Sequence, residues 1–104
     1  MTNVDIILPT YNCEKTIDEK INSVINQSFK DWNLIVIDDA STDSTVIQIK
    51  QYLKDNRVSF KILKRNKGAG FCRNLGIRQS KSKYIAFIDS DDLWKENKLK
   101  VQLK

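Results

Sequence analysis

The sequence predicts an α/β protein in which helices cover both faces of a parallel sheet. Short apolar runs alternate along the chain with segments of helical periodicity, which is the pattern of repeated strand–helix units. Most of the strand-like runs are apolar at consecutive positions, so both of their faces need cover. Because crossover connections are right-handed, few arrangements remain, and we expect a Rossmann-like sheet with strand order 3-2-1-4.

The first strand and helix are predicted from an apolar run and a capping pattern. Val4–Leu8 is a short apolar run that Pro9 stops, as expected of a buried strand. Thr16-x-x-Glu19 matches a capping box and predicts that a helix begins there. The apolar residues that follow recur at helical spacing: Ile17, Ile21, Val24 and Ile25. We expect this helix to end near residues 27–28.

The second unit repeats the pattern, and a third strand follows it. Leu34–Ile37 is an apolar run that ends at two aspartates. Residues 41–43 are suitable helix caps, so a second helix is expected after them. Its apolar face comprises Val46, Ile49 and Leu53. The third strand is predicted from alternating apolar residues: Val58, Phe60 and Ile62.

A third helix, a fourth strand and the start of a further helix complete the pattern. Residues 66–68 suggest a turn before a helix over Gly70–Gln79. Three residues of that helix are expected to face inward: Phe71, Cys72 and Leu75. Tyr84–Ile88 is predicted as another apolar strand, and a last helix is expected to begin near Leu93. We place the two tryptophans, Trp32 and Trp94, against the sheet edges.

Composition excludes several classes of site. The chain has 104 residues and no histidine, so catalysis by Ser-His-Asp or Cys-His and His-bearing zinc sites are excluded within it. The two cysteines are too few for a disulfide scaffold. Neither a Walker A motif nor a complete dinucleotide fingerprint is present. No apolar run approaches the roughly 20 residues of a membrane span. We expect one cytoplasmic domain over residues 1–104.

Charge is distributed unevenly along the chain. The net charge is +5, with nine acids and six bases in residues 1–58 against four acids and twelve bases in residues 59–104. A basic half can meet nucleic acid, anionic lipid or a phosphorylated ligand, or it can be a solvated lysine-rich face. No basic helix motif or aromatic platform typical of nucleic-acid binding is present, so no nucleic-acid partner is expected.

Polar residues gather where the predicted strands end. Ligands of doubly wound sheets bind outside the carboxyl ends of the strands, where the strand order reverses. The residues expected at that edge are Pro9-Thr10-Tyr11-Asn12, Asp38-Asp39 and residues 89–92. Tyr11 can stack on a base or pack against the protein. One acid of the Asp38-Asp39 pair is expected to face a nucleoside and the other to cap the loop toward Ser41, the alternative being two solvent-facing acids.

The acids after the fourth strand predict a metal site. Asp89-x-Asp91, with Asp92 adjacent, places three carboxylates within four residues. Their mutual repulsion is relieved by a cation, and carboxylates suit Mg²⁺ or Mn²⁺. The alternative is that Asp91 or Asp92 caps the helix expected at Leu93. Arg73 either helps to hold an anion or pairs with an aspartate.

Four blocks of the chain together resemble family 2 glycosyltransferases with a GT-A fold: VDIILPTYN, SVINQSFKDWNLIVIDDASTDST, NKGAGFCRNLGI and KYIAFIDSDDLW. The resemblance covers essentially the whole chain. It implies inverting transfer of a sugar from a nucleotide-diphospho-sugar, often a UDP-sugar, to a saccharide or lipid-linked acceptor in cell-surface polysaccharide or glycan synthesis. It also implies a divalent metal, Mn²⁺ or Mg²⁺.

The resemblance also assigns roles to residues. By position, Pro9, Thr10, Tyr11 and Asp39 match nucleoside-binding positions, and Arg73 matches an arginine near the diphosphate. Asp89 and Asp91 match the D-x-D motif, with Asp91 the expected direct metal ligand, and Ser90 between them is grouped with the donor-binding residues.

The chain departs from the family pattern because it ends about a dozen residues after Asp91. The catalytic base of the family is an Asp or Glu farther downstream, so we expect it beyond residue 104, and we expect this chain to be the donor-binding part of a truncated domain. Peripheral membrane association and oligomer formation stay open. The alternative function is a non-catalytic α/β nucleotide- or phosphate-binding regulatory module.

Overall fold

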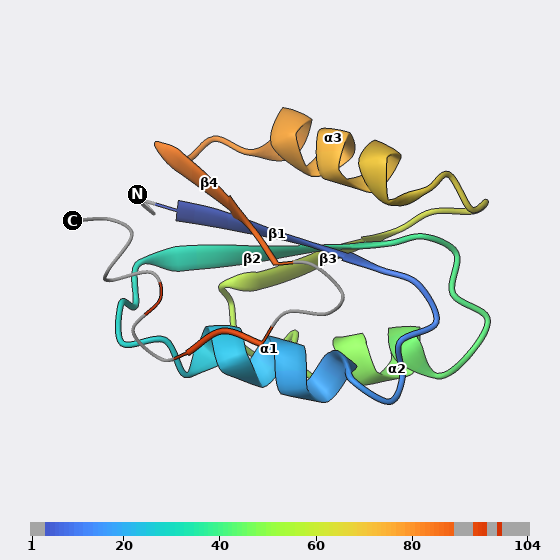
Figure 1. Ribbon diagram of the computed structural model, residues 1–104, viewed down its shortest axis with the longest axis horizontal. Helices are drawn as coiled ribbons and strands as arrows, with labels where there is room; N and C mark the ends of the chain where they lie inside the picture. Colours follow the sequence, from blue (N-terminus) through green and yellow to red (C-terminus); the bar gives the residue numbers. More distant parts are fainter. Residues whose placement is uncertain (1–3, 89–92, 96–97, 99–104) are drawn as a thin grey trace.

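The computed structural model describes residues 4–88, 93–95 and 98 and confirms the predicted α/β architecture (Figure 1). Strands and helices alternate in the following order: β1 (Val4–Thr10), α1 (Ile17–Ile25), β2 (Trp32–Asp38), α2 (Thr45–Lys50), β3 (Val58–Ile62), α3 (Ala69–Gln79) and β4 (Tyr84–Phe87). The four strands form a parallel sheet in the expected order β3-β2-β1-β4. The loops that follow β1, β2 and β3 lie together at the right of Figure 1.

The register of the sheet brings the carboxyl ends of β1 and β2 to the same level. β1 pairs with β2 along its whole length, from Val4 opposite Trp32 to Thr10 opposite Asp38. Its pairing with β4 is shorter and stops at Ile7 opposite Phe87. Pro9, which has no N–H to donate, follows two residues after that point. Among the described strands, β2 alone pairs with β1 as far as Thr10.

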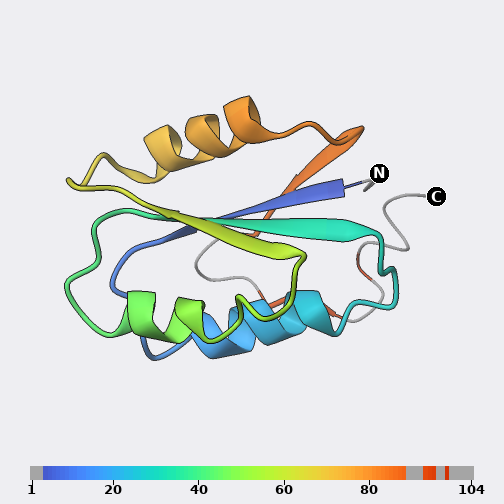
Figure 2. The ribbon, with the colours of Figure 1, turned by 180° about the vertical axis from the view of Figure 1, so that it is seen from behind.

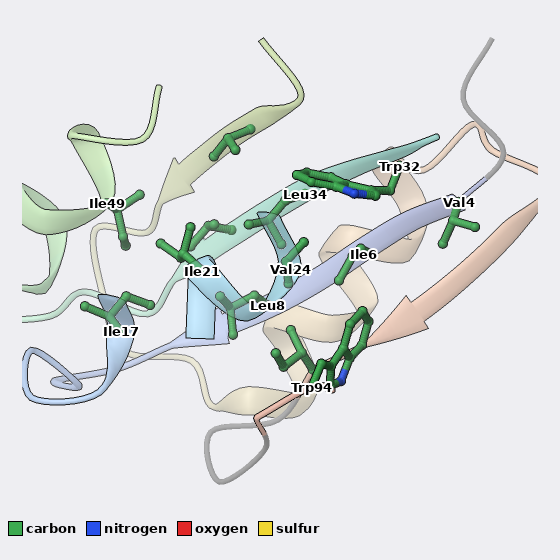
Figure 3. Close-up of a cluster of buried hydrophobic side chains, with 13 residues drawn as sticks. Val4, Ile6, Leu8, Ile17, Ile21, Val24, Trp32, Leu34, Ile49 and Trp94 are labelled. Carbon is green, nitrogen blue, oxygen red and sulfur yellow. The ribbon is translucent and has the colours of Figure 1, made fainter. Parts of the chain in front are cut away.

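Helices cover both faces of the sheet, as Figures 1 and 2 show: α1 and α2 lie on one face and α3 on the other. The main core fills the space between the sheet and the α1–α2 layer (Figure 3). Its buried members are all aliphatic or aromatic: Val4, Ile6, Leu8, Ile17, Ile21, Val24, Trp32, Leu34, Val36, Ile49, Val58, Ile88 and Trp94. These residues alternate along β1 and β2, which is why the opposite face of the same strands is available for α3.

The α3 face is held by a smaller cluster and by one close backbone approach. Ile35, Ile37 and Cys72 form the buried cluster there. A Cβ added at Gly76 would lie 2.7 Å from Ile7 Cγ2, so a glycine at this position lets the helix lie directly on β1.

Some expectations about local structure are wrong. Thr16 begins α1 but makes no side-chain cap; its hydroxyl and backbone N–H both point to the Cys13 carbonyl instead. α1 ends at Ile25, two residues early. Phe71 is 40% exposed, because Cys72 and Gly76, one turn apart, are the positions of α3 that face the sheet.

The outer strands are less buried than their apolar sequences suggest. Three of the four residues of β4 are exposed, and only Val58 of β3 is buried, because each strand lies at an edge of the sheet. Trp32, in contrast, is fully buried in an inner strand rather than at an edge, and the Arg57 guanidinium lies 3.9 Å from its ring centroid. Trp94 is buried in the main core. Leu53 lies beyond the end of α2 and is 36% exposed.

None of the helices in the described part of the chain is both long and apolar enough to cross a membrane.

Candidate nucleotide site

The carboxyl ends of β1 and β2 converge, as the sequence predicts. The Asp39 N–H donates to the Thr10 carbonyl at 2.8 Å, which extends the β1–β2 pairing by one step beyond the strands. The Ile88 N–H donates to the Ile7 carbonyl at 3.1 Å. The carboxyl end of β4 therefore lies beside β1 and points in the same direction as the carboxyl ends of β1 and β2. Residues 89–92, which include Asp89, Ser90 and Asp91, lie outside the described residues.

Asp38 is the acid that caps the loop after β2. The Ser41 N–H and hydroxyl donate to its two carboxylate oxygens at 2.9 and 2.7 Å, and the Thr10 hydroxyl donates to Oδ1 at 2.6 Å. The Asp38 side chain is completely buried. The expectation that one acid of the pair caps toward Ser41 is therefore confirmed for Asp38, whose carboxylate is occupied by protein donors.

Asp39 binds the loop between β3 and α3. The Lys67 and Gly68 N–H groups donate to Oδ1 and Oδ2 of Asp39 at 2.6 and 2.9 Å. Gly68 has a φ of +91°, a backbone conformation that favours glycine. Because each carboxylate oxygen can accept more than one hydrogen bond, Asp39 keeps acceptor capacity for a further donor. Sequence reasoning missed this loop contact, whose only local signal is the glycine after Asn66-Lys67.

The two cysteines are unsuited to act as nucleophiles. Burial, followed by the charge of Asp39 and its hydrogen bond with the thiol, raises the pKa of Cys72 to about 11. Burial also raises the pKa of Cys13 above its usual value. Both groups are therefore thiols at neutral pH, and the thiolate is the reactive form.

The remaining predicted residues surround this edge. Tyr11 follows β1 directly and is 52% exposed, so its ring is not part of the core. Pro9 is half-buried within β1. Arg73 is half-buried on α3, and its positive charge acts to lower the pKa of the neighbouring Cys72.

Metal ligands are not found among the described residues, which contain no group of three or more His, Cys, Asp or Glu side chains arranged to hold an ion. Asp38 and Asp39 accept hydrogen bonds from protein donors instead. The metal prediction falls on Asp89 and Asp91, outside the described part, and stays a prediction.

A groove at the amino ends of the strands, opposite the candidate site, is a second polar location. Its volume is about 520 Å³, and Asp5, Asn33, Arg57 and Ser82 are among its lining residues. Burial acts to raise the pKa of Asp5, but the hydrogen bonds that it accepts from Ser80, Ser82, the Lys81 N–H and Asn33 outweigh this effect and hold the pKa below its usual value. The Lys81 N–H also donates to Asp5, so this carboxylate is satisfied by the protein.

The chain is similar to known proteins along nearly its whole length. The family model described as glycosyl transferase family 2 matches residues 5–104. The chain is 41% identical over 109 residues to the putative teichuronic acid biosynthesis glycosyltransferase TuaG of Bacillus subtilis, covering 100% of this chain and 43% of TuaG. It is 40% identical to the Escherichia coli protein WfgD, a UDP-Glc:alpha-D-GlcNAc-diphosphoundecaprenol beta-1,3-glucosyltransferase, covering 96% of this chain and 39% of WfgD.

A solved structure shares the fold. The crystal structure of Staphylococcus aureus TarS 1–349 in complex with UDP-GlcNAc superposes with a TM-score of 0.92 at 33% identity, covering 98% of this chain and 30% of TarS 1–349. The chain thus spans less than half the length of each of these three proteins. Its sheet is the N-terminal part of a GT-A fold, and the match along nearly its whole length shows that the chain belongs to glycosyl transferase family 2.

Proposed function

We propose that this chain binds a nucleotide-diphospho-sugar, a UDP-sugar, at the carboxyl edge of its sheet, as the donor-binding part of an inverting glycosyltransferase. The observation that carries the proposal is the junction of β1 and β2. There the buried Thr10–Asp38 contact, at 2.6 Å, fixes the two strand ends beside the half-exposed Tyr11 and the Asp39 carboxylate. The relative TarS is described in complex with UDP-GlcNAc, and WfgD is named for a UDP-Glc donor.

The described residues suit a nucleoside. An exposed aromatic ring such as that of Tyr11 offers a face on which a base stacks. The free acceptor positions of Asp39 can take an N–H from the base or a hydroxyl from the ribose. Pro9 and Thr10 are the last two residues of β1, directly before Tyr11.

A divalent metal, Mn²⁺ or Mg²⁺, is proposed on Asp91 and Asp89. Hard cations bind carboxylates and phosphate oxygens, and one bound here would stabilise the negative charge that grows on the departing nucleoside diphosphate. Ser90 and Arg73 are proposed beside the diphosphate, where a guanidinium binds phosphate oxygens with two parallel hydrogen bonds.

The acceptor is proposed to be a saccharide or lipid-linked saccharide in cell-surface polysaccharide synthesis. WfgD is named for a diphosphoundecaprenol-linked acceptor, and TuaG for teichuronic acid biosynthesis. Such an acceptor would bring the protein to a membrane surface. Family membership does not favour the alternative of a regulatory phosphate-binding module.

The proposal is tested by titrating UDP into the protein with Mn²⁺ and with EDTA. We expect tighter binding with Mn²⁺, and we expect Asp91→Asn to abolish the difference. Asp31→Asn is the matched control, because it removes the same charge from an exposed residue just before β2, at the amino edge of the sheet. Equal affinities with and without the metal would contradict the role of Asp91, and an absence of UDP binding would contradict the function itself.

A further inference from the structure

We propose that Asn12 is a positioning residue for the nucleotide site. Its side chain fastens the loop after β1 to the loop after β2 and thereby holds Tyr11 in place before a nucleotide arrives. This inference rests on the proposed function, because it concerns the same site.

The Asn12 side chain, in the loop after β1, accepts hydrogen bonds from the loop after β2. Its Oδ1 accepts the Thr42 N–H at 2.8 Å, the Asp43 N–H at 3.3 Å and the Thr42 hydroxyl at 3.4 Å. The donors are some 30 residues away along the chain, so these bonds join two separate loops rather than stabilise one turn. We call Asn12, Ser41, Thr42 and Asp43 the Asn12 clamp.

The backbone of Asn12 is held as well. Its N–H donates to the Ser41 hydroxyl oxygen at 2.9 Å, and that hydroxyl in turn donates to Asp38 Oδ1 at 2.7 Å. The same Asp38 oxygen accepts the Thr10 hydroxyl. Tyr11 therefore lies between two residues that are linked to the end of β2: Thr10 bonds Asp38 directly, and Asn12 is linked to Asp38 through Ser41.

The residue type fits this position. Asn12 has a φ of +46°, in the left-handed region that asparagine, aspartate and glycine adopt more readily than other residues. Only asparagine and aspartate of these three also supply a side-chain oxygen. The position thus needs both the backbone conformation and the acceptor.

The consequence for ligand binding is preorganisation. A half-exposed ring on a free loop must lose conformational freedom when a base stacks on it, and that loss weakens binding. The Asn12 clamp imposes the order during folding instead. Without the side-chain acceptor, the loop would become ordered only when the nucleotide binds, and the entropy cost of ordering it would weaken binding. We expect affinity to drop by about tenfold, which corresponds to losing one or two such hydrogen bonds.

Other contacts between the two loops make the test possible. The Cys13 N–H donates to the Thr45 hydroxyl oxygen at 2.9 Å, and Gln48 Nε2 donates to the Glu14 carbonyl at 2.9 Å. These bonds join the starts of α1 and α2 independently of Asn12. A variant at Asn12 is therefore expected to fold.

The test compares Asn12→Gly, which keeps the left-handed backbone but loses the acceptor, with Asn12→Asp, which keeps both. We expect Asn12→Gly and Ser41→Ala each to weaken UDP and UMP binding by about tenfold, and Asn12→Asp to stay within about threefold of the wild type. UMP is included because the clamp orders the nucleoside end of the site, so the loss is expected to be the same for both ligands. Tyr52→Phe is the matched control, since it removes a 2.9 Å hydrogen bond from Tyr52 to Asp18 that joins the α1 and α2 regions away from the loops.

Amide hydrogen exchange separates the outcomes. In Asn12→Gly the Thr42 and Asp43 amides are expected to exchange faster, while the core amides of β1 and β2 stay protected. Unchanged affinity in Asn12→Gly, with wild-type binding intact, would overturn the clamp and leave the proposed function standing. An equal loss in Asn12→Asp would also overturn it, because the acceptor is retained there. If the wild type binds no UDP or UMP, the proposed function fails and this inference fails with it.

Discussion

Replacing Asp39 by asparagine should release the loop between β3 and α3. The two carboxylate oxygens of Asp39 each accept one backbone N–H, from Lys67 at 2.6 Å and Gly68 at 2.9 Å. An amide has only one oxygen, so Asp39→Asn leaves one of these N–H groups facing an NH₂ group. A hydrogen bond to a charged group contributes about 1.5–3 kcal/mol, and Asp39 is 4% exposed, so we expect a loss of about 2 kcal/mol in the free energy of unfolding.

A second signal of the same substitution comes from Cys72. The charge of Asp39 and its hydrogen bond with the thiol help, after burial, to raise the pKa of Cys72 to about 11. In Asp39→Asn this pKa should fall, yet stay above that of a free cysteine, because burial and Asp38 remain. The Cβ chemical shift of Cys72, followed against pH, reports the change.

Urea unfolding and amide exchange complete the assay. The Lys67 and Gly68 amides should lose protection in Asp39→Asn, whereas Asp31→Asn, with the same change at an exposed position, should alter stability by no more than about 0.5 kcal/mol. Unchanged protection of both amides together with an unchanged Cys72 pKa would refute the contact on which the reasoning depends.

Two further predictions concern the scaffold. Gly76→Ala should destabilise the protein by about 1–3 kcal/mol in urea unfolding, because the new Cβ would lie 2.7 Å from Ile7. Gly70→Ala is the control on the same helix: its Cβ would have no atom within 4 Å, so it should be neutral or stabilising. Equal effects of the two substitutions would contradict the close approach of α3 to β1. The pKa of Asp5 is lowered in the folded protein. The Asp5 carboxylate therefore makes its full contribution to the free energy of unfolding above the ordinary Asp pKa of about 3.9, and this contribution is lost as the pH falls through the lower pKa of the folded state. The stability of the wild type should therefore fall more steeply in that acid range than that of Asp5→Asn, as measured by unfolding at several pH values; parallel profiles would contradict it.

The strand order was predictable because the apolar runs of β1 and β2 must be buried on both faces and because parallel crossovers leave few topologies. The Asp38 cap was also predictable, since Ser41 is only three residues away. The face of α3 that lies against the sheet was not predictable, because the contact of Gly76 with Ile7 determines it. The pattern of apolar residues alone favours Phe71 as an inward position, yet Phe71 is exposed.

The site was predictable as a location but not as a set of contacts. Tyr11 and Asp39 are at the expected edge because each follows a strand end directly. The partners of Asn12 and Asp39 lie about 30 residues away, and the sequence does not indicate which backbone N–H groups meet a given side chain after folding. The capping box at Thr16 is absent for the same reason, since the loop before α1 is organised by contacts with the loop after β2. The roles of Asp89, Ser90, Asp91 and Arg73 remain predictions.

The most direct test of the nucleotide site is to map the backbone amides that respond to UDP by two-dimensional NMR, because the sheet has polar sites at both the carboxyl and the amino ends of its strands. We expect the shifts to concentrate at Tyr11, Asn12, residues 39–42 and residues 66–68, which lie at the carboxyl edge. Amides around Asp5 and residues 80–82, in the groove of about 520 Å³ at the amino edge, should stay unchanged. Shifts confined to that groove, with none at Tyr11 or Asp39, would contradict the placement of the nucleotide.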